Sequence, residues 1–151
     1  GMMLDDVLKL MMQSEMHREW FVSDLHRLII PAIEAKKLEI MSFSGIPLGM
    51  FTYAFLPRKI EDGYISGEEK LPSDIWNYNP EDGTLYVIDF IAPHKNTLKV
   101  ARWAQKVLTE RYIEKYPRNG AYFIRQGKNK RLGYATGVQS ELEIRRYSCA
   151  V

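Results

Sequence analysis

A single carboxylate lies within an otherwise apolar and aromatic stretch of the chain. Residues 85–93 read LYVIDFIAP, and Asp89 stands in the middle of them. An ionised side chain that is buried without a partner costs several kcal/mol, so a neighbouring group must compensate it. The candidates are an imidazole, an arginine such as Arg102 or Arg125, or backbone N–H groups.

His17 is the imidazole whose surroundings favour chemistry. It lies in SEMHREWFVSD, where Ser14 precedes it by three residues and Trp20 follows it by three. In a local helical turn, this spacing places the three side chains on one side. A carboxylate such as Asp89 can fix the tautomer of an imidazole and stabilise its positive charge. If Asp89 instead pairs with an arginine, its role is structural.

The three histidines do not predict a metal site. His17, His26 and His94 show no HxxxH spacing, and the chain has one cysteine, Cys149. Zinc sites combine several such ligands at short spacings. We expect His26 to be a partly exposed residue of a helix. His94 stands beside Lys95 ahead of a predicted helix start, a position suited to a phosphate group.

Apolar periodicity predicts three helices. A short amphipathic helix covers residues 4–12, and a second begins at Ser23 or Asp24, both suitable N-caps, and runs to about residue 36. Pro31 should kink the second helix or mark where it begins again. The third helix covers about residues 96–116, with an apolar stripe made of Val100, Ala101, Ala104, Val107, Leu108 and Tyr112.

Several segments read as strands. Residues 38–43 and 48–55 form a hairpin around the turn SGIP. Residues 85–93 form a central strand, because their unbroken apolarity indicates burial on both faces. Residues 57–83 are rich in Gly, Pro, Asp and Glu, which indicates a long excursion with a short helical turn near SDIW. Towards the C-terminus, AYFIR, LGYATGV and LEIRRYSCAV add strand segments.

This order of elements predicts an α+β fold in which a largely antiparallel mixed sheet carries helices on both faces. With 151 residues, of which 46% are hydrophobic and 26% charged, the chain fits a single domain over residues 2–151. Gly1, ahead of Met2 and Met3, is expected to be a cloning remnant. Such a fold hosts many functions, so the site residues must decide among them.

The net charge of +2 is unevenly distributed. Residues 1–90 carry 8 Lys and Arg against 15 Asp and Glu, a net −7, whereas residues 91–151 carry 13 against 4, a net +9. The densest basic run, RQGKNKR, contains no aromatic residue for base stacking, so we expect an acidic protein or a phosphate group as partner and not nucleic acid. No apolar run approaches the ~20 residues of a membrane span. One cysteine cannot form an internal disulfide, which fits the cytoplasm.

Two blocks of the sequence carry a resemblance to a known family. SEMHREWFVSDLHRLIIPAIEAKK and LYVIDFIAPHKN resemble the RTX-toxin-activating lysine acyltransferases, the haemolysin-activating family. The first block has that family's Ser-x-x-His-Arg-x-Trp pattern and the second its Asp-aromatic-Ile-Ala-Pro pattern, in the same order. The resemblance covers roughly residues 5–110. The chain departs from the family at Leu28, near which an asparagine is common.

The resemblance implies a GNAT-like fold and a cytoplasmic enzyme. The family moves a fatty acyl group from acyl-carrier protein to the ε-amino group of internal lysines on a protoxin, and homodimers are known in it. By this resemblance His17 and Asp89 are catalytic and Ser14 is important. No permanently bound cofactor is implied, because the acyl donor is the phosphopantetheine thioester of the carrier protein.

The acyl donor is expected at the turn after the central strand. Typical GNAT enzymes bind the pyrophosphate of coenzyme A there with a Gly-rich turn, whereas this chain reads APHKNT, which speaks against ordinary acetyl-CoA. We expect the helix start at Lys95 and Asn96 to hold the phosphate of the phosphopantetheine arm. Further basic residues would meet the acidic carrier protein, namely Lys99, Lys128, Lys130 and Arg131.

The residue types suit transfer to an amine. A thioester is already activated, but a lysine with a pKa of ~10.4 must first lose a proton. His17 can take that proton as a general base, or its imidazole can attack the thioester and carry the acyl group, and the sequence leaves both mechanisms open. Two other functions also stay open: an N-acyltransferase that uses acyl-CoA on a small amine, and a non-catalytic module that binds an acidic partner.

Overall fold

The computed structural model describes residues 2–115, 121–125, 131–135 and 144–148, with side chains for residues 3–115. Helix α1 (Met2–Met12) opens the chain. A second helical segment follows and consists of α2 (Val22–Asp24), η1 (Leu25–Ile29) and α3 (Ile30–Glu34). Both agree with the helices predicted near residues 4–12 and 23–36.

The strands of the described residues form one mixed sheet, in chain order. They are β1 (Leu38–Phe43), β2 (Ile46–Leu56), β3 (Thr84–Ile91), β4 (Ala121–Arg125), β5 (Arg131–Ala135) and β6 (Ile144–Ser148). Neighbouring strands are antiparallel except for β3 and β4, which are parallel. The connection between that parallel pair contains α5 (Thr97–Leu108) and η3 (Thr109–Ile113). The predicted α+β class with a largely antiparallel sheet is therefore confirmed.

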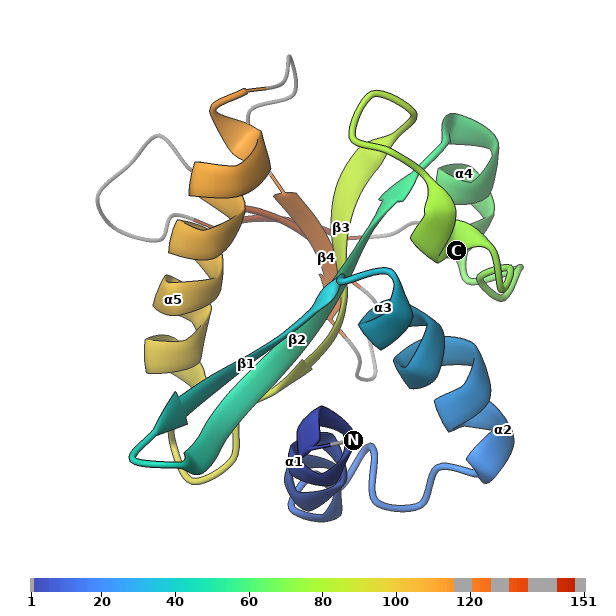
Figure 1. Cartoon of the computed structure of the whole chain (residues 1–151). Helices are drawn as coiled ribbons and strands as arrows, with labels where there is room; N and C mark the ends of the chain where they lie inside the picture. Colours follow the sequence, from blue (N-terminus) through green and yellow to red (C-terminus); the bar gives the residue numbers. More distant parts are fainter. Residues whose placement is uncertain (1, 116–120, 126–130, 136–143, 149–151) are drawn as a thin grey trace.

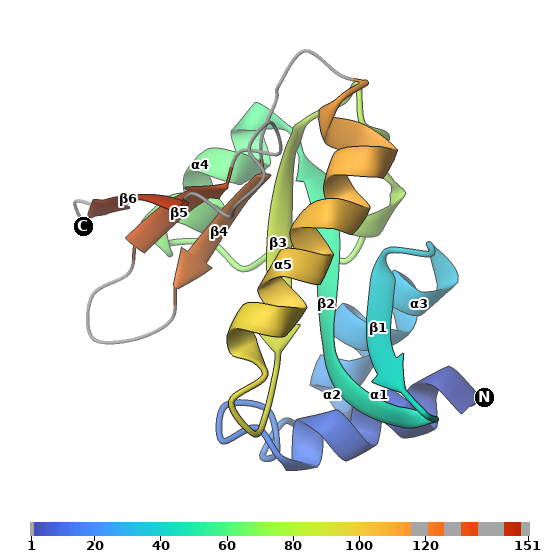
Figure 2. The ribbon, with the colours of Figure 1, turned by 90° about the vertical axis from the view of Figure 1, so that its left-hand side faces the viewer.

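Helices cover both faces of the sheet (Figures 1 and 2). On one side, which we call the α5 face, α5 and η3 pack on the buried aromatic residues of β2, Phe51, Tyr53 and Phe55. On the other side, the α1 face, lie α1, the α2–η1–α3 segment and α4 (Arg58–Ser66). Strands β2 and β3 are thus buried on both faces, as the unbroken apolarity of residues 85–93 predicted.

Helix α5 shows the amphipathic pattern expected from the sequence. Val100, Ala104 and Leu108 are buried, whereas Lys99, Arg102 and Lys106 are exposed. Together α5 and η3 cover nearly all of the predicted range 96–116, and Asn96 is the N-cap.

The β1–β2 hairpin turns at Ser44 and Gly45, both of which have positive φ angles, 49° and 78°. Such two-residue turns match the right-handed twist of the strands they join. The second strand begins at Ile46, two residues earlier than predicted, because Ile46 pairs with Phe43 across the hairpin.

The second helix begins one residue before the predicted N-caps. Phe21 is the N-cap, so the assignment of Ser23 or Asp24 to that position is wrong. Asp24 nevertheless contributes to the cap from within the first turn, because its Oδ2 accepts the Phe21 N–H at 2.8 Å.

Pro31 marks where the α-helix begins again, as predicted, because α3 starts at Ile30 and Pro31 lies in its first turn. Proline has no N–H to offer the carbonyl of Arg27, four residues earlier. The preceding turn, η1, is a π-helix, and the Ile30 N–H bonds to the Leu25 carbonyl five residues back. The indole Nε1 of Trp76 donates to the Arg27 carbonyl at 3.2 Å. A distant side chain thus satisfies the acceptor that proline leaves without its usual donor.

Residues 57–83 contain more regular structure than predicted. Helix α4 was not expected, because glycine and charged residues dilute its apolar pattern, yet Ile60, Tyr64 and Ile65 pack on the α1-face cluster. The predicted helical turn near SDIW is present as η2 (Ile75–Asn77). Lys37 anchors this region, since its Nζ donates to the carbonyls of Trp76 and Tyr78 at 2.6 and 2.7 Å. Burial lowers the pKa of Lys37.

Tyr53 provides a test of the packing on the α5 face. Burial, and then the hydrogen bond with Tyr112, raises the pKa of Tyr53 above its ordinary value of 10.0. The folded state then holds this proton more tightly than the unfolded chain. The resulting stabilisation is present below pH ~10 and is lost as the pH rises further, towards the folded pKa.

We therefore expect the free energy of unfolding to fall with pH above ~10, and Tyr53→Phe to flatten this fall by up to ~1.4 kcal/mol per pH unit. Urea denaturation from about pH 8 to 11.5 measures the effect. Parallel stability curves for the two proteins would contradict it.

Candidate active site

The loop between α1 and α2 carries Ser14, His17 and Trp20. The N–H groups of His17 and Arg18 donate to the Ser14 carbonyl at 3.1 and 2.9 Å, and the Trp20 N–H donates to the His17 carbonyl at 3.1 Å. The imidazole of His17 lies against the indole of Trp20, with ring centroids 4.8 Å apart. These consecutive turns bring Ser14 and Trp20 to the imidazole, as the three-residue spacing predicted.

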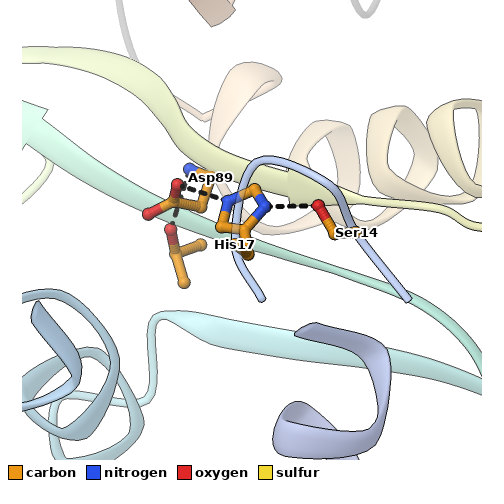
Figure 3. A network of polar contacts seen from close by, with 4 residues as sticks. Ser14, His17 and Asp89 are labelled. Atoms are coloured by element: carbon orange, nitrogen blue, oxygen red, sulfur yellow. Dashed lines mark hydrogen bonds and ion pairs between the residues drawn. The ribbon is translucent and has the colours of Figure 1, made fainter. Parts of the chain in front are cut away.

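Ser14, His17 and Asp89 form a hydrogen-bonded chain (Figure 3). Ser14 Oγ lies 2.6 Å from His17 Nδ1, and His17 Nε2 lies 3.1 Å from Asp89 Oδ1. The side chains of His17 and Asp89 are 4% and 12% exposed. Asp89 makes no ion pair with an arginine within residues 3–115. The residue pattern alone left the partner of Asp89 open, and the family resemblance favoured His17; in the structure the partner is His17.

The chemistry of the three groups sets the positions of the protons. An ionised carboxylate only accepts hydrogen bonds, so His17 Nε2 must carry a proton to bond to Asp89. In the neutral ring, Nδ1 then has a free lone pair, and the Ser14 hydroxyl donates to it. The chain therefore has the order of serine, histidine and aspartate that supports proton transfer in acyl-transferring enzymes.

The surroundings of Asp89 include two residues that sequence reasoning missed. The Asp89 N–H donates to Thr52 Oγ1 at 3.0 Å. Tyr64 of α4 is the second, because burial, and then the negative charge of Asp89, raises the pKa of Tyr64. The sequence signal for Thr52 is that it is the polar residue in the apolar run GMFTYAFL of β2.

The loop of residues 13–21, which we call the histidine loop, makes a second contact, with the turn after β3. His94 Nε2 and Gln13 Oε1 are hydrogen bonded. Gln13 Nε2 donates to the Lys9 carbonyl at 3.0 Å, so the amide oxygen faces His94 and the imidazole is the donor. Gln13 was not anticipated from the sequence. The loop is thus held at two points, one on β3 and one on the turn that follows it.

The predicted donor residues lie at the start of α5. Lys95 and Lys99 are exposed, and the Asn96 carbonyl accepts the Val100 N–H at 2.9 Å. His94 and Lys95 both have left-handed φ angles, 58° and 61°, although neither is glycine. Lys128 and Lys130 lie outside the described residues. Arg131 begins β5, and its side chain is outside the described part.

The described residues show neither a cluster of metal ligands nor a membrane-spanning helix. There, no three His, Cys, Asp or Glu side chains gather as metal ligands would. No helix in that part of the chain has the length and apolarity needed to cross a bilayer. His26 lies in η1, a helical position as predicted, and its side chain is exposed.

A serine, a buried histidine and a carboxylate joined by hydrogen bonds are a combination that recurs in enzymes of acyl-group chemistry. Comparison with known families is specific on this point. The sequence profile of the RTX toxin acyltransferase family matches residues 2–133, and the chain belongs to that family. It is therefore an acyltransferase, and the resemblance carried by the two sequence blocks is confirmed.

Three relatives illustrate the similarity. The leukotoxin-activating lysine-acyltransferase of Mannheimia haemolytica serotype T3 is 30% identical over 135 residues, which are 89% of this chain and 74% of the relative. The RTX-II toxin-activating lysine-acyltransferase of Actinobacillus pleuropneumoniae is 33% identical over 90 residues, 60% of this chain and 54% of the relative. A protein-lysine myristoyltransferase of Kingella kingae is 27% identical over 108 residues, 71% and 62% of the two chains.

The tautomer of His17 can be tested without any assay of activity. We expect NMR of the protein with isotope-labelled histidine to show neutral His17 protonated at Nε2 and unprotonated at Nδ1, because Asp89 accepts from Nε2. Asp89→Asn removes the fixed acceptor, and the signals should then report a mixture of tautomers. Asp74→Asn changes an exposed aspartate and serves as the control. Protonation at Nδ1 in the unmodified protein would show that the contact is wrongly assigned.

Proposed function

We propose that this protein is a protein-lysine acyltransferase that moves a fatty acyl group from acyl-carrier protein to the ε-amino group of internal lysines in a toxin-like protein. The proposal rests on the hydrogen bonds that join Ser14, His17 and Asp89 in a member of an acyltransferase family. Relatives that are named as toxin-activating lysine-acyltransferases support the acceptor. A relative named as a myristoyltransferase supports a long acyl chain.

The proposed roles follow from the proton that the acceptor must lose. A lysine ammonium is not nucleophilic, and its pKa of ~10.4 leaves it charged at neutral pH. His17 removes that proton through Nδ1, the nitrogen with a free lone pair. Asp89 keeps the other nitrogen protonated and stabilises the imidazolium that forms. The amine then attacks the thioester carbonyl, and the C–S bond breaks. The second amine proton goes to the departing sulfur, so the carrier protein leaves as its thiol, and His17 releases the first proton to solvent.

Burial favours the general-base mechanism over an acyl-histidine intermediate. The His17 side chain is 4% exposed, and its Nδ1 is already bonded to Ser14 Oγ at 2.6 Å. Attack of Nδ1 on a thioester would require that Ser14 move and that the buried ring be uncovered. Ser14 is half-exposed, so its hydroxyl can meet the amine and pass the proton inward to Nδ1. In this proposal Ser14 is a proton relay.

In this proposal the acyl donor, the phosphopantetheine thioester, binds at the turn between β3 and α5. Left-handed backbone at non-glycine residues is costly and is concentrated at functional sites, which supports a role for His94 and Lys95. Lys95, Asn96 and Lys99 would hold the phosphate of the phosphopantetheine arm near the first turn of α5. Lys128, Lys130 and Arg131 would meet the acidic surface of the carrier.

The proposal also includes the setting of the reaction. We infer a GNAT-like arrangement over a single domain of residues 2–151, supported by one sheet with helices on both faces and a parallel β3–β4 pair. The cytoplasm and a homodimer follow from the family resemblance. Strongly exposed apolar side chains support a protein partner: Phe21, Val22, Phe43 and Ile46 are 64–80% exposed.

Transfer itself is the first test. The purified protein, a candidate protein acceptor and myristoyl-loaded acyl-carrier protein should yield acceptor whose intact mass increases by one or more acyl groups. His17→Ala should reduce the rate by about 100-fold or more, because a general base typically supplies 10²–10⁴. Ser14→Ala should lose less, since water can replace a relaying hydroxyl. The control is His26→Ala, which removes a histidine that is not part of the hydrogen-bonded chain of Ser14, His17 and Asp89.

Two results would contradict the proposed function. Transfer from acyl-CoA but not from carrier protein would assign a different donor. No transfer to any protein lysine, with acylation of a small amine instead, would assign a different acceptor.

Charge reversal tests the placement of the carrier protein. Lys99→Glu should weaken carrier binding several-fold at low salt, and the difference should shrink as salt screens the charges. Lys106→Glu makes the same change at an exposed position about two turns further along α5, and it should weaken binding less. Equal effects of the two substitutions in calorimetric titrations would remove the start of α5 from the carrier site.

A further inference from the structure

Strand β3 contains one residue more than its pairing with β2 requires. Thr52 pairs with Asp89, and the next residue of β2, Tyr53, pairs with Val87. Ile88 therefore has no partner on β2, which makes a β-bulge immediately before Asp89. Bulges re-aim the side chains that follow them and recur next to active sites.

The bulge determines which face of the sheet Asp89 occupies. Leu85 and Val87 belong to the α5-face cluster, and Tyr86 and Ile88 to the α1-face cluster, as alternation requires. Strict alternation would send residue 89 to the α5 face. Instead Phe90 belongs to the α5 face and Ile91 to the α1 face. The alternation is therefore displaced by one residue, and Asp89 reaches His17, which follows α1.

Thr52 contacts the backbone at that displaced position. Its side chain is fully buried, and its Oγ1 accepts the Asp89 N–H at 3.0 Å. Met50, Ala54 and Leu56 of β2 belong to the α1-face cluster, so alternation along β2 also directs Thr52 to the α1 face. The hydroxyl thus lies on the face where His17 meets Asp89.

We propose that Thr52 is a positioning residue, whose hydroxyl holds the β3 bulge and thereby keeps the Asp89 carboxylate on His17 Nε2. The expected effect of Thr52 on the rate rests on the acyl transfer proposed above. Its expected effect on the tautomer of His17 does not depend on that function. A hydrogen bond from the backbone of Asp89 fixes the direction of the side chain better than packing alone. Small displacements of a catalytic group cost large factors in rate.

Thr52→Val removes the hydroxyl and keeps the shape of the side chain. We expect kcat for acyl transfer to fall by about 10–100-fold, with KM for both substrates unchanged, because neither substrate is bound by Thr52. Thr52→Ser keeps a hydroxyl and should retain most of the rate. Thr84→Val is the matched control, since Thr84 is a 2% exposed threonine of β3 whose Oγ1 has no hydrogen-bond partner among the described residues.

A double-mutant cycle distinguishes a positioning role of Thr52, which acts through Asp89, from a loss of activity that does not involve Asp89. In the Asp89→Asn background, Thr52→Val should cause no further loss of kcat, because Thr52 acts through Asp89. NMR of labelled histidine provides a readout independent of transfer: Thr52→Val should convert the single tautomer of His17 into a mixture, and Thr84→Val should not. If no transfer is observed in any variant but the tautomer responds, the positioning role stands and the proposed function fails.

Three results would overturn the proposal. The first is an unchanged His17 tautomer in folded Thr52→Val. The second is an equal loss of kcat with and without the Asp89 carboxylate. The third is unfolding of both Thr52→Val and Thr52→Ala, because Thr52 would then serve the fold and not the site.

Discussion

The burial of the Asp89 carboxylate is the constraint on which the arrangement of the site depends. Asp89 lies in a strand that is covered on both faces, and its side chain is 12% exposed. His17 compensates the charge from 72 positions away along the chain. Without the Nε2–H donor of His17, the ionised carboxylate would be buried without that hydrogen bond, which is unfavourable. This contact places the loop that carries His17 over β3, and the preceding helix α1 packs on the same face through Val7, Leu10 and Met11.

The polar groups at the centre of the sheet are grouped in one place. Thr52 and Asp89 are register partners on β2 and β3, and apolar clusters lie on both sides of these strands. Had the two polar residues occupied different rungs, each would have needed its own partner in an apolar layer. Because the two residues are neighbours, the Thr52 hydroxyl accepts the backbone N–H of Asp89, and Asp89 Oδ1 accepts the hydrogen bond from His17. The same arrangement presents Asp89 Oδ1 to the imidazole of His17, while Asp89 Oδ2 has no hydrogen-bond partner among the described residues.

The sequence predicted those parts of the fold that depend on local pattern. The unbroken apolarity of residues 85–93 identified a strand buried on both faces, and the apolar stripe of α5 identified its buried side. Helix α4 was missed because Ile60, Tyr64 and Ile65 pack well only against a surface assembled from other segments. The N-cap of the second helix was misplaced because Phe21 has no capping side chain, and Asp24 supplies the bond from within the helix.

For the site, spacing placed Ser14 beside His17 and the family resemblance joined Asp89 to them, but neither explained how β3 chooses the face on which Asp89 lies. That choice depends on the bulge at Ile88, and strict alternation from Val87 would have placed Asp89 beside α5. The bulge depends on the pairing with β2, which no local pattern in β3 reveals. Thr52 and Gln13 were missed for the same reason, because each acts through a contact with a segment distant in the sequence.

The hydrogen-bonded chain also has a direction. The Asp89 carboxylate, at the inner end, only accepts hydrogen bonds while ionised. The proton on His17 Nε2 therefore stays in place, and the lone pair of Nδ1 is directed outward to Ser14. Reversing the chain would require a proton on Asp89. In the proposed mechanism, a proton that enters through the half-exposed Ser14 would arrive at an imidazole already aligned with a negative charge. The imidazolium formed there is stabilised by a charge that the fold has already buried, so no solvent reorganisation is needed when the proton arrives.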